Sequence, residues 1–158
     1  MSGATALAIG WLQRALRHEF SAARQFALQA VQARRLGDAA LAADFERSAG
    51  EELAHAQRFA HALAELGAPF GDGAAPPRPT GRTLVELLVH ACETEAAAVR
   101  LYRDAARRCA GAVAIRRLFE AIGAEEAAHL EDFERRLRAL SDRAPGRSRD
   151  RLENGILI

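Results

Sequence analysis

Apolar side chains recur at alternating steps of three and four residues along four long stretches of the chain. This spacing places them on one face of an α-helix, whereas a half-buried strand would alternate at every second residue. No window alternates apolar and polar residues for long. The pattern therefore predicts four amphipathic helices, at residues 5–36, 38–66, 82–110 and 112–140.

The breaks between these stretches indicate how the helices are connected. Gly37 suits the end of one helix and Asp38 the start of the next, and the break near residue 111 is equally short. Each pair of helices should therefore be antiparallel. Residues 67–80 hold four of the five prolines, which predicts a loop. An extended loop of about 14 residues spans roughly 45 Å, the length of a helix of about 30 residues.

We therefore expect an all-α chain that forms an antiparallel four-helix bundle over residues 1–141, with a long crossover between the second and third helices. A length of 158 residues favours a single domain. Residues 142–158 form a tail or a short fifth helix, for which a weak signal lies around residues 148–154.

The composition narrows the classes of function. The hydrophobic share is 49%, and 22 basic against 21 acidic side chains give a net charge of +1, which argues against a nucleic-acid partner. No apolar run reaches the roughly 18–20 residues that span a bilayer. The first residues lack the basic segment of a signal peptide, and the two cysteines make no disulfide framework. We expect a cytoplasmic protein without a membrane partner.

A carboxylate interrupts each predicted apolar face near its middle. In chain order, the interrupting residues are Glu19, Glu52, Glu95 and Glu126. Two histidines, His55 and His129, each follow one of these glutamates by three residues. Side chains at this spacing lie about 5–6 Å apart on one helix face, so a Glu and a His there could bind the same metal ion.

The charge of these faces favours bound metal ions over unpaired carboxylates in the core. Buried, unpaired carboxylates cost several kcal/mol each, and no arginine lies on the same faces to neutralise them. Two divalent cations would balance four carboxylates. Oxygen and imidazole ligands without thiolates suit iron or manganese, and also zinc.

The residue pattern leaves alternatives open. Glu51 and Glu125 precede the two histidines by four residues, which is also a same-face spacing, and Glu93 lies close to Glu95. We favour the glutamates through which the apolar faces pass. The motifs could instead belong to solvated helix faces. The remaining histidines, His18, His61 and His90, lie off the apolar faces and are predicted to be surface residues.

These motifs resemble those of bacterioferritins, within the ferritin-like superfamily, over about residues 5–140. Residues 18–20 read His-Glu-Phe where that family has a segment like Asn-Glu-Leu. Residues 51–55 read Glu-Glu-Leu-Ala-His where the family has Asp-Glu-x-x-His, and residues 125–129 match its Glu-Glu-x-x-His. The single glutamate of the third helix is matched by Glu95.

The resemblance implies a di-iron ferroxidase centre with two iron ions per chain. Glu19 and Glu95 would be terminal ligands, and Glu52 and Glu126 would bridge the two ions. His55 and His129 would bind one ion each. Members of the family oxidise Fe(II) with O2 or H2O2 and store the ferric product in a homo-oligomeric shell of 24 subunits, so we expect a homo-oligomer.

Three features depart from the family. Leu53 stands where bacterioferritins have the Met that binds haem, so haem is not expected. Phe26 stands where the first helix often has a Tyr beside the di-iron centre, and Tyr102 is the only Tyr in the chain. The tail is unlike the family's last helix. The competing functions are a rubrerythrin-like peroxide reductase or other di-iron oxidoreductase, and a non-catalytic shell subunit with a structural metal.

Overall fold

The computed structural model describes residues 3–71 and 78–143. These residues form four helices: α1 (Gly3–Arg35), α2 (Ala39–Glu65), α3 (Leu84–Arg108) and α4 (Val113–Arg143). The described residues contain no strand. The all-α four-helix bundle predicted from the sequence is thus confirmed. The weakly signalled fifth helix around residues 148–154 lies outside the described residues.

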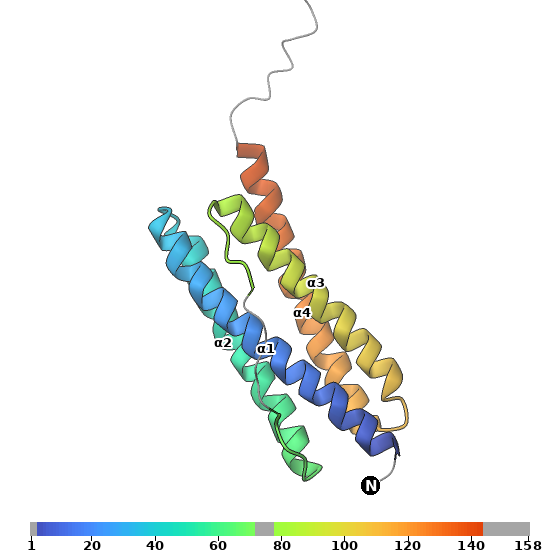
Figure 1. Cartoon of the computed structure of the whole chain (residues 1–158). Coiled ribbons are helices and arrows are strands. Elements are labelled where there is room, and N and C mark those ends of the chain that lie inside the picture. Colours follow the sequence, from blue (N-terminus) through green and yellow to red (C-terminus); the bar gives the residue numbers. More distant parts are fainter. Residues whose placement is uncertain (1–2, 72–77, 144–158) are drawn as a thin grey trace, which may run out of the picture.

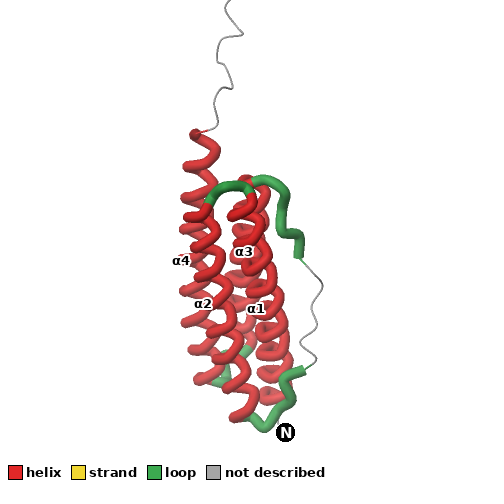
Figure 2. The backbone as a smooth tube through the Cα atoms, turned by 90° about the vertical axis from the view of Figure 1, so that its left-hand side faces the viewer, coloured by secondary structure: helices red, strands yellow, loops and turns green. Residues whose placement is uncertain are grey.

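Two antiparallel hairpins, α1 with α2 and α3 with α4, pack side by side, with α1 against α3 (Figure 1). Helices α2 and α3 run in the same direction, so the chain must cross the length of the bundle between them (Figure 1). Figure 2 shows that the described parts of this crossover lie along the α1 side of the bundle. None of the described helices is long and apolar enough to span a membrane.

Local capping sets where the helices begin. The Asp38 carboxylate accepts a hydrogen bond from Leu41 N at 2.8 Å, and Gly37 has a φ of 88°, as expected for this short turn. Helix α3 begins at Leu84 rather than near residue 82 because Thr83 is its N-cap. Thr83 Oγ1 accepts a hydrogen bond from Glu86 N, and the Glu86 carboxylate accepts one from Arg82 N.

The apolar core consists of two clusters separated by a polar layer. One cluster includes the rings of Phe59, Tyr102 and Phe119, whose centroids lie 5.3–5.9 Å apart. The other includes the rings of Phe26, Phe45 and Phe133, at 5.5–6.0 Å. On every helix the interrupting glutamate lies between residues of the two clusters. The bundle therefore holds the polar layer rigidly from both ends.

Glutamines of α1 tie this helix to α3 and to the crossover. Gln29 Nε2 donates hydrogen bonds to Leu87 O at 2.9 Å and to Thr80 O at 3.1 Å. At the other end of the crossover, Gln13 Nε2 donates to Pro69 O at 2.8 Å. These contacts hold the described parts of the crossover against α1.

Candidate metal centre

All six side chains predicted from the sequence meet in the polar layer. They are Glu19 on α1, Glu52 and His55 on α2, Glu95 on α3, and Glu126 and His129 on α4. Five of them are buried, with at most 4% of the side chain or of the whole residue exposed. His129 is the exception, with 20% of its side chain exposed. The alternative interpretation, in which these residues lie on solvated helix faces, is therefore wrong.

The six side chains form two overlapping sets of potential metal ligands. One set comprises Glu19, Glu52, His55 and Glu126, and the other comprises Glu52, Glu95, Glu126 and His129. Within each set, one ligand atom per residue lies within 4.8 Å of the others. Glu52 and Glu126 belong to both sets. The arrangement suits two neighbouring ions with two shared carboxylates, a pattern that four-helix bundles use for di-iron and di-manganese sites.

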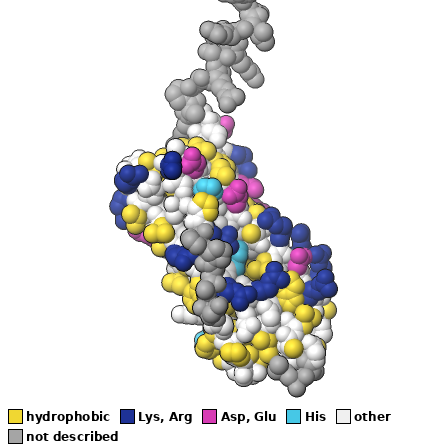
Figure 3. Space-filling model, in the orientation of Figure 1, with side chains coloured by type: hydrophobic (Ala, Val, Ile, Leu, Met, Phe, Trp, Pro, Cys, Tyr) yellow, Lys and Arg dark blue, Asp and Glu magenta, His cyan; other side chains and the backbone are white. Residues whose placement is uncertain are grey.

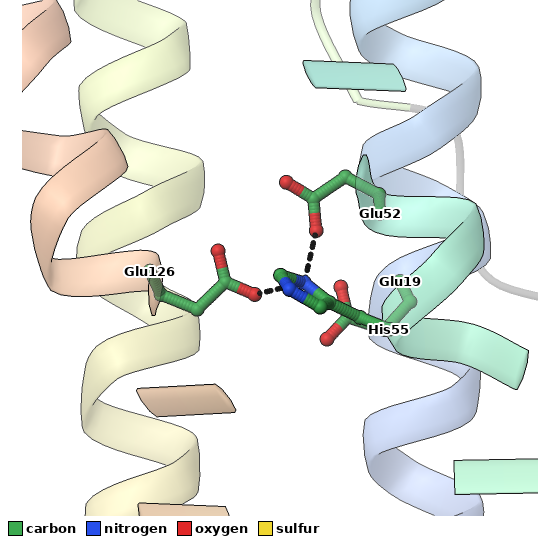
Figure 4. Close-up of side chains that lie close together, drawn as sticks. All are labelled: Glu19, Glu52, His55 and Glu126. Atoms are coloured by element: carbon green, nitrogen blue, oxygen red, sulfur yellow. Dashed lines mark hydrogen bonds and ion pairs between the residues drawn. The ribbon is translucent and has the colours of Figure 1, made fainter. Parts of the chain in front are cut away.

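The histidine of the first set points between its two shared carboxylates. His55 Nδ1 lies 3.0 Å from Glu126 Oε1 and 3.4 Å from Glu52 Oε2, and Glu19 approaches from α1 (Figure 4). The second histidine is placed in the same way, since His129 Nδ1 lies 3.4 Å from Glu126 Oε2. In each case Nδ1 is the nitrogen that faces the centre.

Several polar atoms of this layer have no hydrogen-bond partner among the described residues. These buried atoms include Glu19 Oε2, Glu52 Oε1, Glu95 Oε1 and His129 Nδ1. Buried polar atoms are normally paired, and an unpaired one costs about 1–3 kcal/mol. Divalent cations would satisfy all four atoms, so the residues present fit a metal pair.

Burial and mutual repulsion shift the outer glutamates toward the neutral form. Burial raises the pKa of Glu19 and of Glu95 well above the ordinary value for glutamate, and the charge of Glu52 raises both further. Without metal, burial and repulsion therefore favour the protonated forms of these two side chains. Metal binding must displace these protons, so metal affinity should increase with pH.

The histidines and Glu126 are shifted toward their charged forms. Burial lowers the pKa of His55, but its hydrogen bonds with Glu126 and Glu52 outweigh that effect and raise the pKa to about 10. Burial raises the pKa of Glu126, but its close contacts with the imidazoles of His129 and His55 lower it to about 2. Glu126 is thus a carboxylate over the whole neutral range.

The three alternative glutamates lie outside the centre. Glu93 has 69% of its side chain exposed and pairs with His90. Glu125 Oε2 lies 2.9 Å from His55 Nε2 and is also bound by Arg58, and Glu51 Oε2 lies 3.4 Å from His129 Nε2. Each histidine therefore contacts an outer carboxylate through the nitrogen that faces away from the centre. Such contacts orient metal-binding imidazoles in many metalloproteins.

Tyr102 lies beside the centre, which the apolar pattern of α3 did not indicate. Its ring is fully buried, and its hydroxyl donates a hydrogen bond to Glu19 Oε1. This bond leaves Glu19 Oε2 as the carboxylate oxygen without a hydrogen-bond partner among the described residues. The sequence shows only that Tyr102 is the single tyrosine of the chain, which does not indicate that it lies next to Glu19.

The prediction that His18 is a surface residue is wrong. Arg78, from the crossover, donates a hydrogen bond to His18 Nδ1 at 3.0 Å, and the imidazole packs edge-on against Tyr102 with centroids 6.2 Å apart. Burial and the Arg78 charge lower the pKa of His18 to about 4. His61 is exposed, as predicted, and His90 is partly exposed.

Comparison with known proteins agrees with this geometry. The sequence matches the ferritin-like domain family over residues 9–149. Two similar solved structures are bacterioferritins, each 26% identical in sequence to this chain. The Rhodobacter capsulatus protein has a TM-score of 0.82 and aligns over 87% of each chain; it was described with a metal-free dinuclear site and a haem iron. The Desulfovibrio desulfuricans protein has a TM-score of 0.85, and the alignment covers 90% of this chain and 84% of that protein's chain. It was described with its diiron site in different catalytic states. No curated protein sequence matches the chain.

Proposed function

The chain belongs to the ferritin-like domain family, and from this premise we propose that it is a ferroxidase that oxidises Fe(II) to Fe(III) at a di-iron centre within each subunit, for iron storage or detoxification. The observation that carries the proposal is the pair of overlapping ligand sets that share Glu52 and Glu126. A purely structural bundle would gain stability from apolar residues at these positions.

In this proposal each side chain has a defined task toward two Fe(II) ions as substrate. Glu19 and Glu95 bind one ion each from α1 and α3, and Glu52 and Glu126 bind both. His55 and His129 complete the two sites through Nδ1. Two ions supply two electrons, which together with two protons convert O2 to H2O2, or H2O2 to two waters. Four carboxylates stabilise the ferric state, because hard anionic oxygen ligands balance its higher charge.

The outer contacts support the same roles. Glu125 accepts a hydrogen bond from His55 Nε2, and Glu51 lies 3.4 Å from His129 Nε2, which keeps each Nδ1 directed at the centre and raises its basicity. Tyr102 restrains Glu19 to bind through its free oxygen. The centre is therefore preorganised on four helices rather than on loops.

A homo-oligomer is part of the proposal, with a shell of 24 subunits as its form. Large apolar side chains are exposed on the outside of the hairpin of α1 and α2, among them Leu28, Val31 and Leu53 at 47–65%. Burial between subunits would remove them from water. We expect no bis-methionine haem, because Leu53 occupies the position of the haem-binding Met. A cytoplasmic location remains an expectation.

The direct test is an anaerobic Fe(II) titration of the metal-free protein, followed by addition of O2 or H2O2 and a count of the iron oxidised per chain. The oligomer is sized on the same sample. We expect about two Fe(II) bound per chain and turnover well beyond two. Two ions that oxidise once and remain bound in a small oligomer would instead indicate another di-iron oxidoreductase. Binding without oxidation would indicate a structural metal.

Matched variants separate the centre from the protein surface. Glu126→Gln should abolish oxidation, since it removes a carboxylate common to both sets. Glu93→Gln, an exposed glutamate on α3, should retain wild-type turnover. Equal activity of the two variants would contradict the proposed ligand set.

A further inference from the structure

A cavity of about 430 Å³ lies in the groove between α3 and α4, close to the turn that joins these helices (Figure 1). Small-molecule sites commonly have volumes of about 300–1,000 Å³. All the residues that line the cavity belong to α3, to α4 or to the turn between them, and none is a candidate metal ligand. The proposed function leaves this cavity without a role.

Small side chains create the cavity. Ala106 of α3 and Gly123 of α4 line it, and Ala110 lies at its end. Packed helices normally fill the groove between them with side chains, but alanine and glycine leave that space open. Beneath it, the buried rings of Tyr102 and Phe119 form a floor. Walls and floor are therefore mostly hydrocarbon, which favours an apolar occupant over water.

The cavity is a slot that runs along the two helices. Its lining residues on α3 extend from Val99 to Arg107, and those on α4 extend from Arg116 to Gly123. At the rise of an α-helix these stretches are about 12 Å and about 10 Å long. A slot of this shape suits an extended, unbranched alkyl chain better than a compact ring system.

The edge of the slot is basic. Three arginines line it, namely Arg103, Arg107 and Arg116, against the single carboxylate of Glu120. Figure 3 shows basic side chains gathered over the C-terminal part of α3. Charge at this edge therefore favours an anion over a cation.

Ion pairs reduce this excess to one charge. Arg116 Nη1 donates to Glu120 Oε1 at 2.8 Å, and Arg107 pairs with Asp104, which lies outside the lining. Arg103 has no hydrogen bond or ion pair within the part of the chain that the structure describes. One guanidinium thus remains available at the edge of an apolar slot.

These features together specify the chemistry of an occupant. A guanidinium stays charged at all physiological pH values and binds a carboxylate through two parallel hydrogen bonds. The apolar stem of an arginine also covers neighbouring hydrocarbon while its charged end stays in water. An alkyl chain in the slot would therefore place a terminal carboxylate within reach of Arg103.

We infer that this slot binds a medium-chain alkyl carboxylate, with the chain between α3 and α4 and the carboxylate at Arg103. This inference goes beyond the proposed function and does not depend on metal binding. An apolar segment of a second copy of the chain is the competing occupant. The unpaired charge of Arg103 favours the carboxylate, because a purely apolar segment would leave that charge without a partner.

The test is isothermal titration calorimetry of the metal-free, full-length protein with octanoate and with 1-octanol, which has the same alkyl chain but no charge. We expect one octanoate to bind per chain. Arg103→Gln removes the unpaired charge, and Arg100→Gln removes an exposed charge one turn away and outside the lining. Octanoate should bind several-fold more weakly to Arg103→Gln than to Arg100→Gln at about 0.05 M salt, and the difference should shrink at about 0.5 M. Octanol should bind both variants equally.

A second pair of variants tests the slot itself. Val99→Phe fills part of it from a partly exposed position, and Val85→Phe makes the same change on α3 at a residue that is 43% exposed and outside the lining. We expect Val99→Phe, but not Val85→Phe, to lose both octanoate and octanol binding. Every variant is also sized as an oligomer, and its size should not change.

Three results would overturn the inference. The first is that the wild type binds no octanoate. The second is that either variant of the slot binds octanoate as tightly as its control. The third is that Val99→Phe alters the size of an oligomer that binds no octanoate, which would show that a second copy covers the slot. Because no metal is added, failure of iron oxidation would refute the proposed function and leave this inference standing.

Discussion

Replacing one buried ligand by its neutral isostere should stabilise the metal-free protein. Glu95 lies in the polar layer with 1% of its surface exposed, and its Oε1 has no hydrogen-bond partner among the described residues. Burial and the charges of Glu52 and Glu126 raise its pKa well above the ordinary value. Glu95→Gln keeps the shape of the side chain and removes the need to bury a charge or take up a proton.

The size of the effect follows from proton linkage. A glutamate titrates near pH 4.5 in the unfolded chain, whereas native Glu95 keeps its proton to higher pH. Between these two pKa values the native state binds one more proton than the unfolded state, so its stability falls by about 1.4 kcal/mol per pH unit as pH rises. At about pH 7.5 we expect Glu95→Gln to be more stable than the wild type by about 1–4 kcal/mol. At about pH 5.5 the gain should be smaller, because this pH lies closer to the pKa at which the unfolded chain loses that proton.

The assay is urea unfolding of chelator-treated protein at several pH values, followed by circular dichroism at one fixed protein concentration. Glu93→Gln is the matched control, because Glu93 lies on the same helix with 69% of its side chain exposed. That variant should change the free energy of unfolding by less than about 0.5 kcal/mol at every pH. Destabilisation by Glu95→Gln at pH 7.5, or a gain that does not grow with pH, would refute the reasoning.

Four other substitutions test separate parts of the molecule. Zn(II) should raise the urea midpoint of the wild type but not of Glu52→Gln, because Glu52 belongs to both ligand sets. Tyr102→Phe keeps the packed ring but removes the hydrogen bond to Glu19, so Co(II) affinity measured by calorimetry should fall several-fold. In urea unfolding, Phe45→Ala should lower the free energy of unfolding by about 3–5 kcal/mol, because it leaves a cavity in the core. Asp38→Ala should lower it by about 1 kcal/mol, because α2 loses its helix cap.

The apolar periodicity was sufficient to predict the bundle and the residues of its polar layer. Each interrupting glutamate lies one or two turns from buried apolar residues of its own helix, so helical geometry alone directs it inward. The choice of Glu52 over Glu51 follows from this register. A shift of one residue turns a side chain by about 100°, which is why Glu51 lies outside the polar layer, with 41% of its side chain exposed.

The groups around the layer could not be predicted, because they depend on contacts between distant segments. Arg78 reaches His18 only because the crossover follows α1, and no periodicity describes the path of a proline-rich loop. Tyr102 fits the apolar face of α3, and only the packing of α1 against α3 brings its hydroxyl to Glu19. Local patterns thus predict which residues face inward, and tertiary packing decides what they touch.

The most direct test of the metal centre is a crystal structure of the protein loaded anaerobically with Fe(II), with anomalous diffraction measured at the iron edge. We expect two iron peaks about 3.5–4 Å apart in the polar layer, both bound by Glu52 and Glu126. His55 should bind one ion and His129 the other, each through Nδ1. Iron at the outer carboxylates Glu51 or Glu125 alone, or no iron between the four helices, would contradict the proposed centre.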